Sequence, residues 1–411
     1  MASSSSLHMT WPKTCRCIYF ISNRLVRRAF PIALATTCII LIMVLLQNKL
    51  ALNNVQEYTL QSDRLIGFRR MVSVSREETV YEDKGKAQRE SNPGAKDTYN
   101  KVGKQQENQR NVTKKTRYLR YFAESRRNTF PLSVRPDPYA INNQYVCRSS
   151  KDLDLLILVI SASEHFHTRH VVRTTWGDVK NYPNHQIRVV FLLGLSNNDS
   201  VNAQINKENS ANKDIVQGNF NDSYRNLTHK AVMGMRWTLE YCPNAKLVVK
   251  VDDDTFVNMF KLLDDMYIYK NKSKEIFCYK RDANSSIIQR TEGQWPLSLD
   301  FFRNMTHFPF PHCNGFFVIF SADIIKPLYE ASKIAPFIWM DDVYLTGLVP
   351  EIIGGIQLTA LDSLMYYEAI GFDCFKSQKK RCNLLAMITY SRGVLEYLWN
   401  SIQANRKLPL A

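Results

Sequence analysis

Three short apolar runs constrain the fold of this 411-residue chain more than any other feature. The runs at 155–160 and 189–193 are continuously apolar, which is typical of strands buried on both faces. A further strand is predicted at 246–251. Helical patterns separate the three, one at 168–176 and one from an N-cap at Asp222 or Ser223 towards Glu240. This order of strands and helices predicts an α/β domain with a mostly parallel central sheet flanked by helices.

Polar segments divide the rest of the chain. Residues 49–135 have few apolar clusters and mixed charge, so they cannot bury enough surface to order themselves and are interpreted as a solvated stem. The following residues, 136–411, are enough for one large domain. Within that domain the segment 197–212 is interpreted as a polar loop.

Positive charge is concentrated outside the predicted domain. The whole chain carries a formal charge of +16, of which residues 1–28 contribute +5 and residues 49–135 contribute +9. Only +2 remains for residues 136–411. A nearly neutral domain argues against nucleic acid as a partner.

An uncharged run of 20 residues, 29–48, lies between Arg28 and Lys49. As a helix it would be roughly 30 Å long, the thickness of a bilayer's hydrocarbon core. Five upstream cations without an acid place the N-terminus in the cytoplasm by the positive-inside rule. We therefore expect a cytoplasmic tail at 1–28, an uncleaved signal-anchor at 29–48 and a lumenal stem and domain. A buried helix is the alternative, although it would not need the basic flank.

Sequons and cysteines are consistent with export of the domain. Seven Asn-X-Ser/Thr sequons lie beyond residue 48, and six of the nine cysteines do too. An even number of cysteines favours disulfides in an oxidising compartment. Spacing predicts only the pair Cys374–Cys382 and leaves the pairing of the other four open.

The predicted strand 246–251 runs directly into three carboxylates, Asp252, Asp253 and Asp254. In α/β sheets ligands bind beyond the carboxyl ends of the strands. Alternate residues of an extended segment point the same way, so Asp252 and Asp254 can converge on one hard divalent cation. Such a cation commonly completes its coordination with phosphate oxygens, which suggests a diphosphate substrate. A solvated acidic turn is the alternative.

Several stretches in order over roughly residues 150–350 resemble the Golgi β-1,3-glycosyltransferases of glycosyltransferase family 31. They contain the family's Arg-rich Thr-Trp-Gly segment, its Asp-Ser-Tyr segment, its DxD strand, and its Cys-x-Gly and Asp-Val-Tyr elements. The matching residues are 169–177, 220–230, 250–258, 313–315 and 341–344.

This resemblance implies a GT-A fold and inverting, Mn²⁺-dependent transfer of a hexose, galactose first, from a UDP-sugar to the 3-hydroxyl of an acceptor glycan on glycoprotein or glycolipid. It implies a Golgi membrane protein whose metal ligands are Asp252 and Asp254. It places the catalytic base at Asp342, with Asp341 as its neighbour. Further donor-site candidates are Arg173, Asp222, Lys230 and Asp253.

Several alternatives stay open for these residues. Arg173 suits a diphosphate or a catalytic acid, and equally a tie between the first helix and the sheet. Asp341 and Asp342 also suit the N-terminus of a helix. Trp176, Trp295 and Trp339 could stack on sugar or uracil, although large apolar residues are more often part of the core. The cluster of His165, His167 and His170 lacks the spacing of a helical metal site.

The chain departs from the family pattern at three places. Phe317 stands where the family has a second glycine, which we expect to reshape the acceptor pocket. Gly347 lies one residue later than the pattern has it, and no histidine follows His312. Transfer of N-acetylglucosamine or N-acetylgalactosamine is therefore an alternative activity, and a glycan-binding protein without transfer is an alternative of another class.

Overall fold

The computed structural model describes residues 139–148, 152–378 and 382–407. The predicted tail, anchor and stem, and the boundaries between them, lie outside these residues. Among the helices of the described residues, none has the length and apolar character needed to cross a membrane.

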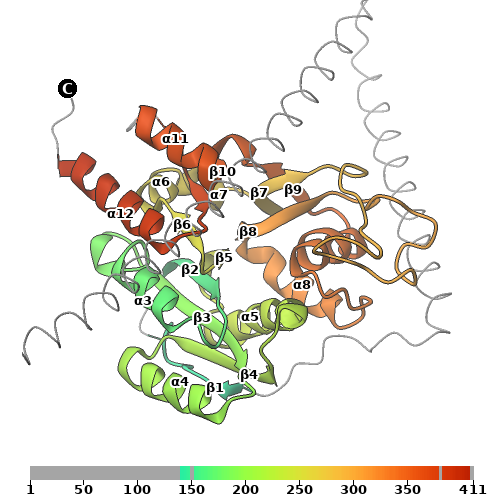
Figure 1. Ribbon diagram of the computed structural model, residues 1–411, viewed down its shortest axis with the longest axis horizontal. Helices are drawn as coiled ribbons and strands as arrows, with labels where there is room; N and C mark the ends of the chain where they lie inside the picture. The colour runs from blue at the N-terminus through green and yellow to red at the C-terminus, as the bar shows by residue number, and fades with distance from the viewer. Residues whose placement is uncertain (1–138, 149–151, 379–381, 408–411) are drawn as a thin grey trace, which may run out of the picture. The chain divides into compact units, whose positions relative to one another are not determined.

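An eight-stranded sheet in the order β1-β4-β3-β2-β5-β8-β7-β9 forms the centre of the domain (Figure 1). Its strands are β1 (Tyr139–Ile141), β2 (Leu153–Ile160), β3 (Ile187–Leu195), β4 (Ile215–Asn221), β5 (Ala245–Asp252), β7 (Glu275–Arg281), β8 (His312–Ser321) and β9 (Gln357–Ala360). The three predicted strands are β2, β3 and β5, each two to four residues longer than predicted. A second sheet, in the order β10-β11-β6, joins β6 (Thr255–Val257), β10 (Met365–Tyr367) and β11 (Ala386–Ile388).

The central sheet is mixed, so the prediction of a mostly parallel sheet holds only for part of it. Strands β4, β3, β2 and β5 are parallel. Strand β8 is antiparallel to both of its neighbours, β5 and β7, and β1 is antiparallel to β4. The sequence pattern missed this because β7 returns into β8 through a connection without helix or strand, whereas parallel neighbours need a crossover on one face of the sheet.

Helices cover both faces of the sheet (Figure 1). On one face lie α5 (Leu227–Tyr241), α8 (Ile325–Ser332) and the segment from α9 (Asp341–Val343) to α10 (Val349–Ile353). On the other lie α3 (Phe166–Thr174), α4 (Asp199–Asn212), α6 (Met259–Asp264) and α12 (Arg392–Lys407). The remaining helices are α7 (Met266–Lys270) and α11 (Glu368–Gln378).

Alternation along β2 explains the two hydrophobic cores. Leu156 and Leu158 pack against the α5 side, whereas Ile157 and Val159 pack against the α3 side. Each of these side chains is at most 1% exposed. A strand with apolar residues on both faces can bury both sets of side chains only between two helical layers. This is why polar and apolar residues do not alternate in the run at 155–160.

One prediction of local structure is wrong, and another holds only in part. The predicted loop 197–212 is helix α4, whose N-cap Asn198 accepts a hydrogen bond from Ser200 N at 2.9 Å. Among its side chains only Ile205 is buried, so the segment shows no apolar periodicity. Of the two predicted N-cap residues, Ser223 precedes a 3₁₀ turn, Tyr224–Asn226, that leads directly into α5 at Leu227, whereas the Asp222 carboxylate binds Lys230 and the backbone N–H groups of Ser163 and Gly194.

Three disulfides link the described cysteines. The predicted pair Cys374–Cys382 is confirmed, and the other two bonds are Cys147–Cys242 and Cys278–Cys313. The bond Cys278–Cys313 joins the neighbouring strands β7 and β8.

An ion-pair network ties α3 to the elements beside it. Arg173 donates to Glu208 of α4 at 2.6 Å and to Asp214 at 2.7 Å, and its guanidinium lies 4.4 Å from the centre of the Phe191 ring. Arg169, which is fully buried, shares Glu208 at 2.7 Å and donates to the carbonyl of Ala162. These contacts favour the structural interpretation of Arg173.

Replacing Arg173 by methionine should therefore lower stability and leave nucleotide binding unchanged. We expect the free energy of unfolding to fall by about 3 kcal/mol, because Glu208 and Asp214 lose a partner in a largely buried setting. Urea unfolding measures this change, and calorimetry measures the affinity of the folded variant for UDP. Lys246→Met is the matched control, since Lys246 pairs with Asp152 at the surface and should change stability by less than about 0.5 kcal/mol. A folded Arg173 variant with weakened UDP binding would contradict the structural role.

Candidate active site

A cavity of about 1330 Å³ opens at the carboxyl ends of the parallel strands. The segments after β2, β4 and β5, the start of β8, and the start of α9 all contribute to its wall. This is where α/β sheets bind their ligands, because the strand ends leave backbone groups and loop side chains free to converge. Of the predicted site residues, Asp222, Lys230, Asp252, Asp253, Asp254, Asp341 and Asp342 line the cavity. Arg173 does not.

The three consecutive aspartates have different surroundings. Asp252 is the last residue of β5, whereas Asp253 and Asp254 form a turn before β6, so the assumption of an extended segment is wrong. Asp253 accepts a hydrogen bond from Ser161 Oγ at 2.7 Å and lies 2.9 Å from His165 Nδ1. The Asp254 carbonyl accepts from the backbone N–H and the hydroxyl of Thr389, which fixes the turn.

Burial and mutual repulsion disfavour negative charge at this turn. Burial, with repulsion from Asp341 and Asp253, raises the pKa of Asp252 to about 6. Asp254 is exposed at the cavity, where partial desolvation, with repulsion from Asp252 and Asp253, raises its pKa to about 7. Each raised pKa marks a carboxylate that a nearby cation would stabilise in its charged form.

One buried side chain, Lys250, joins the aspartates of β5 to those of α9. Its Nζ lies 2.7 Å from Asp341 Oδ2 and 3.4 Å from Asp252 Oδ1, and it donates to the Gly315 carbonyl at 2.8 Å. The Lys250 side chain is 4% exposed, and the surrounding carboxylates raise its pKa further above its usual value despite burial. Sequence reasoning missed Lys250, because two of its three partners, Gly315 and Asp341, lie on β8 and α9, more than 60 residues away along the chain.

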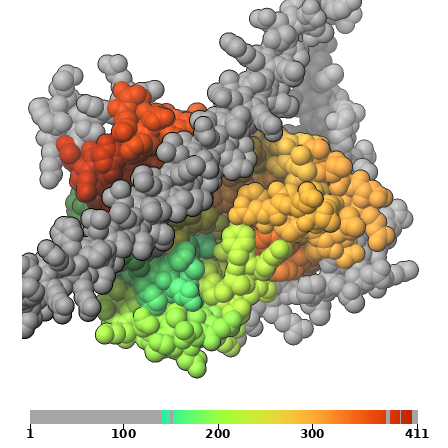
Figure 2. All heavy atoms as spheres, viewed as in Figure 1, coloured from blue at the N-terminus to red at the C-terminus, as the bar shows by residue number. Residues whose placement is uncertain are grey.

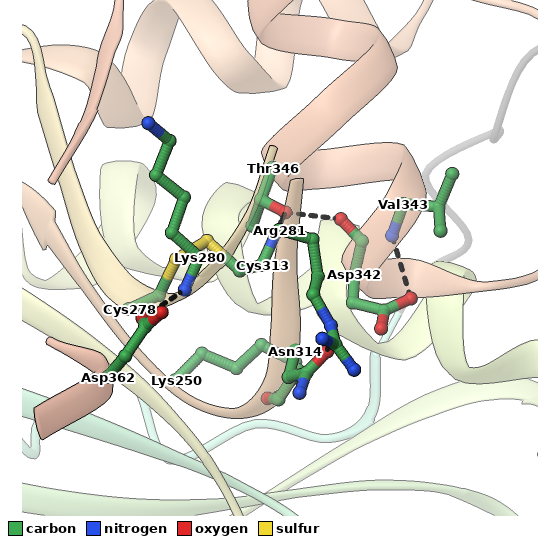
Figure 3. The surroundings of a disulfide bond; sticks show 11 residues. Lys250, Cys278, Lys280, Arg281, Cys313, Asn314, Asp342, Val343, Thr346 and Asp362 are labelled. Atoms are coloured by element: carbon green, nitrogen blue, oxygen red, sulfur yellow. Dashed lines mark hydrogen bonds between the residues drawn. A yellow bond between two sulfur atoms is a disulfide. The ribbon is translucent and has the colours of Figure 1, made fainter. Parts of the chain in front are cut away.

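Hydrogen bonds hold Asp342 through both its backbone carbonyl and its carboxylate (Figure 3). Its carbonyl accepts a hydrogen bond from Thr346 Oγ1, and that oxygen accepts in turn from the backbone N–H of Cys313 at 2.9 Å. The Asp342 carboxylate accepts from Val343 N at 2.7 Å. Burial and the neighbouring Asp341 raise the pKa of Asp342 to about 7. The residue is therefore poised to exchange a proton near neutral pH.

The helix that carries Asp342 has an irregular second turn. Residues Tyr344–Leu348 form a π-helical turn between α9 and α10. A single-turn π-helix accommodates one residue more than an α-helix would. Thr346, which bridges Asp342 to β8, lies within this turn.

Gly315 brings β8 close to Asp342. A Cβ atom at residue 315 would lie 2.9 Å from the Asp342 Cβ and 3.4 Å from Lys250 Nζ, so a side chain there would displace the aspartate. Phe317, expected to reshape the pocket, is fully buried in the core on the α3 side and is not among the cavity-lining residues. The cavity-lining aromatic residue of this segment is Phe316.

Asp222 and Lys230 form a second buried ion pair, at 2.7 Å. Lys230 also donates to the Ser161 carbonyl at 2.6 Å, and Asp222 accepts from the backbone N–H and hydroxyl of Ser163. The pair thus shapes the segment after β2 that forms one wall of the cavity. The Lys230 ammonium is already paired with the Asp222 carboxylate.

Sequence reasoning also missed His165 as a cavity residue and left the tryptophans undecided. His165 lies against Asp253, and its distant partner gave no local signal. Trp176 is fully buried in the core, whereas Trp295 and Trp339 line the cavity.

The residues fit a hard divalent cation only in part. Among the described residues no group of three or more His, Cys, Asp or Glu side chains is arranged to hold a metal. Asp252 and Asp254 nevertheless offer oxygen ligands whose raised pKa values reflect desolvation and repulsion between neighbouring carboxylates. Two carboxylates completed by substrate phosphate and water are a usual set for Mg²⁺ and suit related divalent ions.

Comparison with known proteins identifies the family. The galactosyltransferase family model matches residues 167–359, which contain all the cavity aspartates. The chain is 29% identical to β-1,3-galactosyltransferase 1 of Mus musculus over 284 residues, or 68% of this chain and 83% of the relative. It is 31% identical to β-1,3-galactosyltransferase 5 of Homo sapiens over 221 residues, or 53% of this chain and 68% of the relative.

Among solved structures, a complex of the galactosyltransferase LgtC with donor and acceptor sugar analogues matches with a TM-score of 0.31 and 12% identity. That match covers 60% of this chain and 95% of the other. The identities with the β-1,3-galactosyltransferases extend over most of the domain described above. The chain belongs to the galactosyltransferase family and is a hexosyltransferase.

Proposed function

We propose that this protein transfers a hexose from a UDP-sugar to the 3-hydroxyl of an acceptor glycan, with galactose as the favoured hexose. The transfer inverts the anomeric centre and uses a divalent cation such as Mn²⁺. The observation that carries the proposal is the meeting of two carboxylate groups, Asp252–Asp254 and Asp341–Asp342, in one cavity around Lys250. Membership of the galactosyltransferase family supports the choice of donor sugar.

Two sets of aspartates allow a division of labour. The Asp252 and Asp254 carboxylates would hold the cation, and Asp253 keeps the turn in place through Ser161 and His165. When bound, the cation supplies Lewis-acid neutralisation of charge on the diphosphate leaving group. Lys230 and Asp222 act on the donor side only by shaping the wall after β2.

Asp342 is the proposed general base. The acceptor hydroxyl oxygen forms a bond to C1 of the donor hexose while the bond from C1 to the diphosphate oxygen breaks. UDP leaves with that electron pair, and the hydroxyl proton passes to the Asp342 carboxylate. A single displacement of this kind inverts the anomeric centre. Thr346 and Val343 hold Asp342 in place, and Lys250 limits the repulsion between Asp341 and Asp252.

We also propose that the domain works in the Golgi lumen, anchored by residues 29–48. Three disulfides in the domain support an oxidising compartment. The basic tail before residue 29 supports the orientation.

Replacing Asp254 by asparagine should abolish Mn²⁺-stimulated transfer. The amide keeps the size of the side chain but removes a charge that the cation needs, and because the pKa of Asp254 is raised the fold should tolerate the change. Transfer from UDP-galactose to a panel of methyl glycosides, with Mn²⁺ present or chelated, measures the effect. Asp265→Asn, on a carboxylate paired with Lys261 away from the cavity, is the control. Unchanged Mn²⁺ dependence in Asp254→Asn would exclude a ligand role.

Activity should depend on the ionisation of Asp342. A base must be deprotonated, so kcat/KM should fall as the pH drops below about 7, the value to which burial and Asp341 raise the pKa of Asp342. Removing the neighbouring charge in Asp341→Asn should lower that pKa and shift the acidic limb of the profile to lower pH. The pH dependence of kcat/KM for both proteins tests this. An acidic limb that stays in place, or moves to higher pH, would contradict the role of the pair.

A further inference from the structure

Three aromatic side chains from separate segments meet at one wall of the cavity. Tyr224 comes from the turn before α5, Trp295 from the connection between β7 and β8, and Trp339 from the segment that leads into α9. In the space-filling view the yellow-green surface near residue 220 meets the orange surface of the β7–β8 connection (Figure 2), and a hydrogen bond joins Tyr224 to Trp295 across this boundary. We call these three residues the aromatic wall.

Hydrogen bonds fix the rings of the aromatic wall. The Trp295 indole N–H donates to Tyr224 Oη at 2.9 Å, and the Trp339 indole N–H donates to the Pro296 carbonyl at 3.2 Å. The Tyr224 and Trp339 rings lie 5.9 Å apart, and the Arg225 guanidinium lies 4.0 Å from the centre of the Trp339 ring. Their orientation is therefore set before a ligand arrives, which lowers the entropic cost of binding.

Two members of the aromatic wall are nevertheless exposed, while the third, Trp339, is partly buried against the core. Trp295 is 42% exposed and Tyr224 is 53% exposed, although large aromatic side chains usually bury most of their surface. Rings that are held rigidly and left open to a cavity are typical of a ligand site. The ligand must present an apolar face to stack on them, and the C–H face of a pyranose ring is such a surface.

The position of the aromatic wall distinguishes the acceptor from the donor. Trp339 precedes Asp341 by two residues. Desolvation, with the nearby charges of Asp342, Asp252 and Asp341, raises the pKa of the Tyr224 phenol. A hydroxyl that gives its proton to Asp342 must belong to a ring beside that carboxylate. The donor diphosphate belongs instead at the turn of Asp252 to Asp254.

We propose that Tyr224, Trp295 and Trp339 form the acceptor subsite, on which the terminal pyranose of the acceptor glycan stacks with its C–H face. This inference rests on the proposed function for its assignment to the acceptor. The stacking itself does not require that transfer occurs.

The test is direct binding of methyl β-glycosides of galactose, N-acetylglucosamine and N-acetylgalactosamine to the full-length protein with UDP and Mn²⁺ present. Saturation-transfer NMR and tryptophan fluorescence report binding without turnover. For the glycoside that binds best, Trp295→Ala should raise Kd and acceptor KM by about tenfold or more, with the UDP affinity unchanged. Trp295→Phe keeps a ring and should recover part of the loss. Tyr267→Ala removes an exposed aromatic outside the cavity and should change neither.

The outcomes separate the two proposals. Glycoside binding that is lost in Trp295→Ala, in a protein that transfers no hexose, would support the subsite and refute the proposed transfer. Unchanged glycoside affinity in Trp295→Ala would overturn the subsite, as would a wild-type protein that binds none of the glycosides. A loss of UDP affinity with unchanged glycoside binding would also overturn it, because the wall would then serve the donor base.

Discussion

The contact of Lys250 with two groups of carboxylates holds the active-site cavity together. A buried ammonium between Asp252 and Asp341 lets acidic side chains from β5 and α9 line one cavity together. Without that cation, the repulsion among Asp252, Asp341 and Asp342 would oppose the packing of α9 against β8. The same ammonium binds the Gly315 carbonyl and so connects all three elements. The arrangement is costly in desolvation, which indicates that it is kept for the site rather than for stability.

Much of the fold follows from local patterns, and the exceptions have physical causes. Strands β2, β3 and β5 could be predicted because apolar residues on both faces leave a local record in the sequence. Helix α4 could not, because its single buried side chain, Ile205, produces no periodicity. The antiparallel placement of β8 depends on a connection of about 30 residues that lacks helix and strand, and such a connection does not indicate direction.

Some residues of the candidate site could likewise be predicted from the sequence, and others could not. The carboxylates stood out because acidic residues are rare at the end of a buried strand, and the family motif pointed to Asp342. Lys250, His165 and Thr346 acquire their roles from partners distant in the sequence, which a single chain without its fold does not reveal. For Arg173 the sequence left a ligand role and a structural role open, and the ion pairs with Glu208 and Asp214 favour the structural one.

Because of the π-helical turn at Tyr344–Leu348, the direction of the Asp342 side chain depends on the number of residues in this segment. Each residue of an α-helix turns the chain by about 100°, so one residue more or fewer before α10 would rotate everything upstream by nearly a third of a turn. Thr346 can reach both Cys313 and Asp342 only at the present length. The direction of the proposed base therefore depends on the length of a segment that does not line the cavity, as well as on the Thr346 hydroxyl within it.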